Sequence, residues 1–319
     1  MNNTITAKAL ASTLLENGSH MQPINPQEYH KLKPQLEEIL GYPVISKSNL
    51  FEFMQCPYRY NFNRTHGIRK VSAEMSLGSL VDCLTLTPEL FSSYYKCEPI
   101  RVQLKKDGTP YADGRQDPAQ KAEWQAMAEQ GITIISEEQL ERAKVIAEAA
   151  SSHLASHSLT PASYSTQVAC WQLVKELDGH TLTTPVVICG MLDIAPHTGR
   201  TIYDLKTTST DLANTTKLTY HLEDFGYPLQ GAMYVDLYSA CADRQMTDFA
   251  LLFAGTTEPC LTRRVVLTAD TLEPYRTEYK NAIRAYATAY ALQDYGTPQL
   301  DTLYYSPTAK EARRTADFS

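Results

Sequence analysis

The amino-acid sequence predicts an α/β (α+β) fold in which helices flank a central mixed β-sheet. The first observation is the order of the periodic segments along the chain, which runs helix, strands, helix, strands, helix. The second is the stretch 166–208, where apolar strands are separated by turn residues as in an antiparallel meander. The third is size, because 319 residues with 43% hydrophobic side chains can bury a full core.

The pattern divides the chain into three parts. Residues 1–25 are polar and weakly patterned, so we expect a flexible N-terminus. Residues 26–295 carry the periodic segments and are expected to form the folded domain, beginning with a helical part. Residues 296–319 are predicted to be a polar tail that is basic in part.

The helical part begins with an N-cap signal. Ser46 or Ser48 precedes the apolar positions of a short amphipathic helix, and Pro57 ends it or starts the next turn. Residues 76–90 predict a second, apolar helix in which Asp82 is conspicuous among leucine and valine neighbours. A helix-surface or capping position would explain this acid without any function.

The elements beyond residue 100 follow from periodicity and turn chemistry. Asp178-Gly179 is a strong hairpin signal, and 196–200 has the composition of a turn. The expected order is a loop at 101–118, helices at 121–130 and 137–156, strands at 166–177, 181–184, 186–188 and 202–205, a helix at 225–242, strands at 247–254 and 262–267, and a helix at 269–293.

Three charged residues interrupt the apolar strands around the turn at 196–200. They are Asp193, Asp204 and Lys206. Asp204 and Lys206 are two residues apart, so in a strand their side chains share a face. A charge in a buried strand is costly unless it is paired or binds a metal. Carboxylates and a lysine at one sheet edge suit Mg²⁺ and a negatively charged reaction centre. An ordinary ion pair between Asp204 and Lys206 is the alternative.

Bulk properties exclude several classes. The net charge of −7 lacks the basic excess of a nonspecific nucleic-acid binder, so DNA contact requires a local basic patch or bound metal ions. No apolar run is long enough to span a membrane, and no signal peptide is evident. The seven scattered cysteines include no C-x-x-C pair, which favours a reducing cytoplasm and disfavours a zinc or iron–sulphur site.

One local basic cluster follows the first amphipathic helix. Its members are Arg59, Arg64, Arg69 and Lys70, interleaved with Tyr58, Tyr60 and Phe62. We interpret the basic residues as candidates for phosphate contacts and the aromatic residues mainly as core.

Taken together, these motifs resemble the PD-(D/E)XK nuclease superfamily and, within it, the RecE-like (exonuclease VIII) group. The resemblance covers roughly 28–290 and implies a restriction-endonuclease-like core. Its motifs are Tyr29-His30, I-S-K-S-N-L from Ile45, C-P-Y-R-Y from Cys56, G-S-L-V-D ending at Asp82, K-A-E-W ending at Trp124, G-M-L-D ending at Asp193, Y-D-L-K-T-T from Tyr203, and Gln230 with Tyr234 on one helix.

The resemblance implies a role for each matching residue. Asp193 and Asp204 are similar to the metal-binding acids of the family. Lys206 is similar to the lysine that positions or activates the attacking water. Gln230 and Tyr234 are similar to the helix motif that lines the active site on the DNA side.

Two positions depart from the family pattern. Asp82 stands where the family has a histidine four residues after a glycine, here Gly78. Gln167 stands where the family tends to have a glutamate. Since a carboxylate ligates hard cations well, we expect Asp82 to join Asp193 and Asp204 as a metal ligand.

The resemblance further implies a Mg²⁺- or Mn²⁺-dependent deoxyribonuclease that degrades double-stranded DNA 5′→3′ from an end in phage-type recombination. It implies a homo-oligomer and a single-strand annealing protein as partner. Two alternatives stay open: endonucleolytic action, and a degenerate nuclease fold that only binds DNA or protein.

Overall fold

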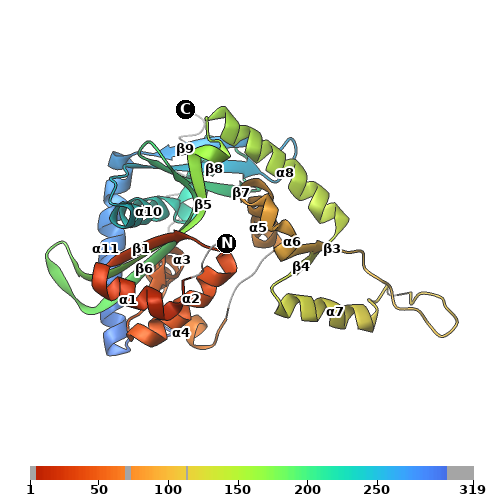
Figure 1. Ribbon diagram of the computed structural model, residues 1–319, viewed down its shortest axis with the longest axis horizontal. Helices are drawn as coiled ribbons and strands as arrows, with labels where there is room; N and C mark the ends of the chain where they lie inside the picture. Colours follow the sequence, from red (N-terminus) through yellow and green to blue (C-terminus); the bar gives the residue numbers. More distant parts are fainter. Residues whose placement is uncertain (1–4, 69–72, 113, 300–319) are drawn as a thin grey trace.

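A mixed β-sheet forms the centre of the computed structural model, which describes residues 5–68, 73–112 and 114–299 (Figure 1). Within these residues the sheet has seven strands, in the order β1-β5-β6-β7-β8-β9, with β2 paired to β6 off this path. Its strands are β1 (Ser19–Pro23), β2 (Val44–Ser46), β5 (Tyr164–Leu177), β6 (His180–Pro196), β7 (Thr201–Thr208), β8 (Asp248–Gly255) and β9 (Thr262–Leu267).

The sheet is antiparallel in its middle and parallel at two places. β5, β6 and β7 form the predicted meander, while β7 pairs in parallel with β8 and β2 pairs in parallel with β6. β8 and β9 are antiparallel. The prediction of a central mixed sheet flanked by helices is therefore confirmed.

Helices cover both faces of this sheet (Figure 1). α3, α10 and α11 share one apolar cluster with the sheet, and α5 and α8 share another. β8 shows the division, because Leu251 and Phe253 belong to the first cluster and Leu252 to the second. The helices of these layers are α3 (Lys47–Gln55), α5 (Ala73–Leu86), α8 (Glu137–Ser156), α10 (Tyr227–Ala242) and α11 (Ala269–Leu292).

The N-terminal segment differs from the expectation of a flexible tail. Residues 7–17 form α1 (Ala7–Asn17), and β1 pairs with β5 at the edge of the sheet. Leu10 and Leu14 are fully buried and share a cluster with Trp171 of β5. These two leucines are one helical turn apart, so a short apolar stripe is enough to anchor an otherwise polar segment.

The other helices complete the body of the molecule. α2 (Pro26–Leu40) packs beside α1, α4 (Pro57–Thr65) follows α3, and α9 (Thr215–Asp224) precedes α10. α9 lies between the predicted strand at 202–205 and the predicted helix at 225–242, where the sequence pattern predicts no element. No helix in the described part of the chain is both long and apolar enough to cross a membrane.

An arm projects from this body (Figure 1, right). It contains the short parallel pair β3 (Tyr95–Cys97) and β4 (Thr133–Ile135), the helix α7 (Pro118–Glu129) and the predicted loop between β3 and α7. Pro88–Leu90 and α6 (Phe91–Tyr94) lead into it. Trp124 of α7 donates to Glu98 Oε2 at 2.9 Å, so this motif residue stabilises the arm.

Candidate active site

The two strand aspartates face each other where β6 and β7 diverge. Ile194 and Tyr203 are the one residue pair in register between the described strands, and this register sets Asp193 opposite Asp204. Beyond that pair, the backbone N–H of Leu205 donates to Asp193 Oδ2 at 3.1 Å. A side chain thus takes the place of a ladder carbonyl, which fixes Asp193 at the point of divergence.

Asp204 is the most buried of these acids, with 2% of its side chain exposed. Its Oδ1 accepts a hydrogen bond from Gln230 Nε2 at 2.8 Å, and its Oδ2 forms an ion pair with Lys206. The predicted sharing of a face by Asp204 and Lys206 is therefore confirmed. Both carboxylate oxygens have partners, and this orients Asp204 toward the lysine.

Helix α10 brings Gln230 and Tyr234 over the same face of the sheet. It begins after Gly226, whose φ of 59° lies in the left-handed region, and Pro228 is in its first turn. The Tyr234 ring lies so close to Gly190 of β6 that a Cβ there would be 2.8 Å from Cε1. Glycine at 190 therefore lets α10 pack directly on β6.

Asp82 reaches the same place from α5. A Cβ at Gly78 would lie 3.0 Å from Thr207 Oγ1 of β7, so the glycine allows α5 to approach the strand closely. One turn later, Asp82 interacts electrostatically with Lys206 and Asp204. Burial, reinforced by Asp204, raises the pKa of Asp82 to about 7, although Lys206 opposes the shift.

The cluster contains three carboxyl groups and one lysine. Burial and then repulsion by Asp204 raise the pKa of Asp193 well above its usual value. Burial alone would lower the pKa of Lys206, but attraction by Asp204 and Asp193 holds it well above its ordinary value. Lys206 is thus a permanent cation among three crowded carboxyl groups.

A comparison with known families decides the classification. The model of the PD-(D/E)XK nuclease superfamily matches residues 44–298, which include all of these side chains. The chain belongs to the PD-(D/E)XK nuclease superfamily. No curated protein gives a significant match.

Solved structures were also compared, and one of them shares the fold. A candidate exonuclease from Eubacterium rectale is similar at 14% sequence identity over 91% of this chain and 99% of its own, with a TM-score of 0.51. A phage-related exonuclease from Haemophilus somnus 129PT is similar at 13% identity over 60% of this chain and 91% of its own, with a TM-score of 0.31. At 14% identity the likeness to the Eubacterium rectale protein concerns the fold alone.

Gln167, the second departure from the PD-(D/E)XK pattern, lies directly across from Asp193. The pairs Thr166–Ile194 and Val168–Leu192 flank it, and its own φ is 50°. The residue is 9% exposed and its Oε1 has no hydrogen-bond partner among the described residues. An unsatisfied buried oxygen on a strained residue is unusual outside functional sites.

Sequence reasoning assigned no role to Lys47 and Tyr227, which border the PD-(D/E)XK cluster. Lys47, the first residue of α3, is 8% exposed, and its ammonium lies 5.7 Å from the centre of the Tyr227 ring. Lys206 lies 5.8 Å from the same ring centre. The signal for Lys47 was available in the sequence, because a lysine at the start of a helix directly after a buried strand is out of place.

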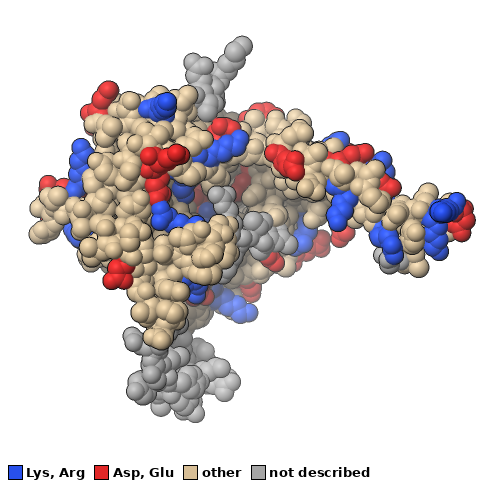
Figure 2. All heavy atoms as spheres, turned by 90° about the horizontal axis from the view of Figure 1, so that it is seen from below, with Lys and Arg blue, Asp and Glu red and all other residues tan. Residues whose placement is uncertain are grey.

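One member of the basic cluster after α3, Arg64, differs from the expectation of a phosphate contact. Arg64 forms an ion pair with Glu37 and lies 5.4 Å from the centre of the Tyr290 ring, so its role is structural. Tyr60 is buried and its hydroxyl lies 3.1 Å from that of Tyr286, as expected of a core aromatic. Tyr58 and Phe62 are exposed, and Arg69 and Lys70 lie outside the described residues. On the face shown in Figure 2, basic and acidic side chains are interspersed over the body.

The donor chemistry of the site fits a divalent cation. Three carboxyl groups gather around one lysine, and burial together with mutual repulsion raises the pKa of two of them, Asp82 and Asp193. A bound cation would favour their charged forms. In the described residues, no three histidine, cysteine or acidic side chains already converge at ligand distance. Asp204 Oδ2 is paired with Lys206 instead.

Proposed function

We propose that this chain is a metal-dependent exodeoxyribonuclease of the RecE-like group, which degrades one strand of double-stranded DNA 5′→3′ from an end. Membership of the PD-(D/E)XK nuclease superfamily supports nuclease chemistry. The observation that carries the proposal is the buried cluster of Asp82, Asp193, Asp204 and Lys206 at the divergence of β6 and β7.

Asp82, Asp193 and Asp204 would hold Mg²⁺ or Mn²⁺, since hard oxygen ligands suit both ions. When bound, the ion supplies Lewis-acid stabilisation of the phosphate and of the attacking water. Replacement of the family histidine by Asp82 adds a negative charge to the donor set. The amide of Gln167, in place of the family glutamate, removes one.

The protein's own groups supply positioning and charge. The Lys206 ammonium stays protonated and stabilises negative charge on the phosphate or orients the water. Asp204 holds Lys206, and Gln230 holds Asp204 through its amide N–H. Burial, followed by repulsion from Asp204, raises the pKa of Tyr234, which therefore lines the site as a neutral phenol.

The proposed partners follow from the RecE-like motifs. They are double-stranded DNA, a single-strand annealing protein that covers the exposed strand, and further copies of this chain in a homo-oligomer. The acidic net charge is compatible with DNA binding when cations are concentrated at the site.

A cleavage assay tests the proposal. Linear duplex labelled at the 5′ or the 3′ end and closed circular duplex are incubated with Mg²⁺ or Mn²⁺. We expect early release of the 5′ label from linear DNA and intact circles. Early release of the 3′ label would reverse the polarity, and circles cut as fast as linear ends would show an endonuclease. Absence of cleavage with either ion would leave a DNA- or protein-binding scaffold.

A further inference from the structure

Lys47 is a buried lysine whose position is fixed from two sides. It follows β2, whose residues Val44–Ser46 pair with 187–189 of β6, and it begins α3. Its ammonium donates to the carbonyl oxygen of Phe225, in the segment between α9 and α10. The side chain therefore lies between the sheet and the start of the helix that carries Gln230.

Aromatic rings flank the Lys47 ammonium. It lies 4.8 Å from the centre of the Phe51 ring and 5.7 Å from that of Tyr227. Among the described residues, no carboxylate forms an ion pair with it. Ring faces and one carbonyl only partly replace the hydration of an ammonium group, so this burial has a cost.

Another cation, Lys206, acts on the Lys47 ammonium. Burial and then repulsion by Lys206 lower its pKa to about 8, and the attraction of Asp204 is the smaller effect. The lysine thus remains cationic at neutral pH. It also stands at the N-terminus of α3, where the helix dipole adds positive potential. A bound anion would relieve all of these contributions together.

We propose that Lys47 is a second phosphate-binding lysine of this active site, which contacts a backbone phosphate of the bound DNA strand next to the region served by Lys206. The inference rests on the proposed nuclease function. The ammonium groups of both lysines lie within 5.8 Å of the Tyr227 ring centre, so Lys47 and Lys206 border the same region of the site. DNA is the anion that fits, since its phosphates are repeated along a strand that must already reach Lys206.

A purely structural role is the rival explanation. In that case Lys47 serves only to satisfy the carbonyl of Phe225 and to hold the start of α10. Two variants separate the roles. Lys47→Gln keeps an N–H donor for this carbonyl but removes the charge. Lys47→Met fills the space between the rings but removes both the donor and the charge.

The experiment measures binding of a labelled linear duplex in Ca²⁺ at several salt concentrations, with a denaturing gel to check for cleavage. Loss of one phosphate contact should reduce the magnitude of the negative slope of log binding constant against log salt concentration by about 0.9. It should also weaken affinity by about tenfold at low salt, as expected for a charged hydrogen bond. We expect both effects in Lys47→Gln and in Lys47→Met, with melting temperatures close to that of the wild type.

Lys144→Gln is the matched control, because Lys144 is an exposed lysine on α8 that pairs with Glu141 at 2.7 Å. Its salt slope should equal that of the wild type. A wild-type slope in Lys47→Gln, with a lower melting temperature in Lys47→Met alone, would overturn the inference and leave the nuclease function standing. A wild type that neither binds nor cleaves DNA would overturn both.

Discussion

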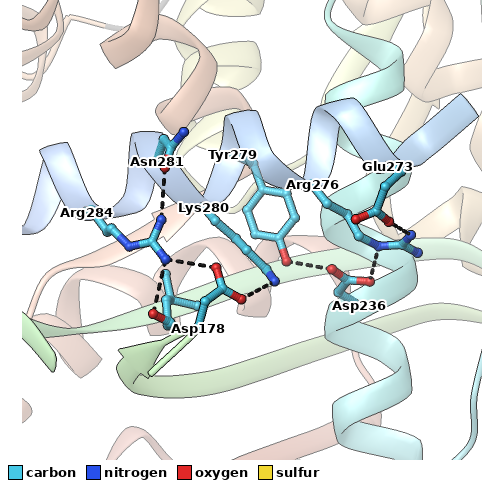
Figure 3. Close-up of polar contacts among 9 residues, drawn as sticks. Asp178, Asp236, Glu273, Arg276, Tyr279, Lys280, Asn281 and Arg284 are labelled. Atoms are coloured by element: carbon cyan, nitrogen blue, oxygen red, sulfur yellow. Dashed lines mark hydrogen bonds and ion pairs between the residues drawn. The ribbon is translucent and has the colours of Figure 1, made fainter. Parts of the chain in front are cut away.

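Two clusters of charged side chains lie on opposite sides of α10, and they differ in how their charges are balanced. Figure 3 shows the first, between α11, α10 and the β5–β6 turn. Its acids Asp178, Asp236 and Glu273 are matched by Arg276, Lys280 and Arg284. Tyr279 also donates to Asp236 Oδ2 at 2.7 Å. Each carboxylate in this cluster has a cationic partner.

The second cluster is the candidate active site, where Lys206 forms an ion pair with Asp204 and interacts electrostatically with Asp82 and Asp193. The two clusters shift carboxyl pKa values in opposite directions. Hydrogen bonds from Lys280 and Arg284 lower the pKa of Asp178, whereas burial and neighbouring acids raise that of Asp193. Balanced charges are typical of a structural cluster, whereas perturbed carboxyl pKa values beside one lysine are typical of a functional site.

The largest expected effect on DNA cleavage is that of replacing Lys206. Lys206→Ala should lower the rate of DNA cleavage by about a hundredfold or more, since one lost interaction with developing charge commonly has that effect. Its melting temperature should also fall when a chelator is present, because the 2%-exposed carboxylate of Asp204 loses its ion-pair partner. Steady-state cleavage of linear duplex and thermal unfolding measure the two quantities.

Lys280→Ala is the matched control from the other cluster. Lys280 is 26% exposed and forms an ion pair with Asp178 at 2.6 Å, so it resembles Lys206 in burial and pairing. Its removal should leave cleavage unchanged. Equal loss of cleavage in both variants would mean that the difference between the clusters has no functional meaning.

Local sequence patterns predicted the centre of this site well. The meander, the turn at 196–200 and the spacing of Asp204 and Lys206 depend on neighbours in the chain, and the structure has all three. The i, i+4 spacing of Gln230 and Tyr234 likewise places both on one face of α10. The catalytic roles of these residues stay predictions.

The parts that could not be predicted depend on contacts between distant segments. Lys47 comes near Lys206 only because β2 pairs with β6, and no local pattern encodes that pairing. The left-handed conformation of Gln167 interrupts a strand that alternates normally in sequence. α1 and β1 were missed because two buried leucines and an edge pairing outweigh a polar composition.

An effect of intermediate size on thermal stability is expected from replacing Asp82, and this effect depends on pH. In the folded protein its pKa is about 7, above the ordinary value of 3.8, so the folded state binds a proton that the unfolded state has lost. This carboxyl group therefore lowers the free energy of unfolding as pH rises from about 4 to 7. With a chelator present, Asp82→Asn should melt like the wild type near pH 4 and higher than the wild type near pH 8.

Thermal unfolding across this pH range, repeated with Mg²⁺ or Mn²⁺, measures the effect. Added metal should stabilise the wild type more than Asp82→Asn, because the variant lacks one carboxylate ligand. A constant difference in melting temperature from pH 4 to 8, together with equal stabilisation by metal, would show that Asp82 is only a helix residue.

The smallest effect on catalysis is expected at Asp236, which lies on α10 but faces α11 (Figure 3). Asp236→Ala leaves Arg276 and the buried Tyr279 hydroxyl without this partner, which should lower the free energy of unfolding by about 1–3 kcal/mol. Asp178→Ala should have a weaker effect, since its carboxylate is half-exposed. Chemical denaturation measures both.

Cleavage by Asp236→Ala below its unfolding transition should stay within about twofold of the wild type, because Gln230 and Tyr234 point toward the sheet from the other side of α10. A large loss of cleavage in folded Asp236→Ala would mean that α11 sets the position of the active-site helix, and that the two clusters are coupled.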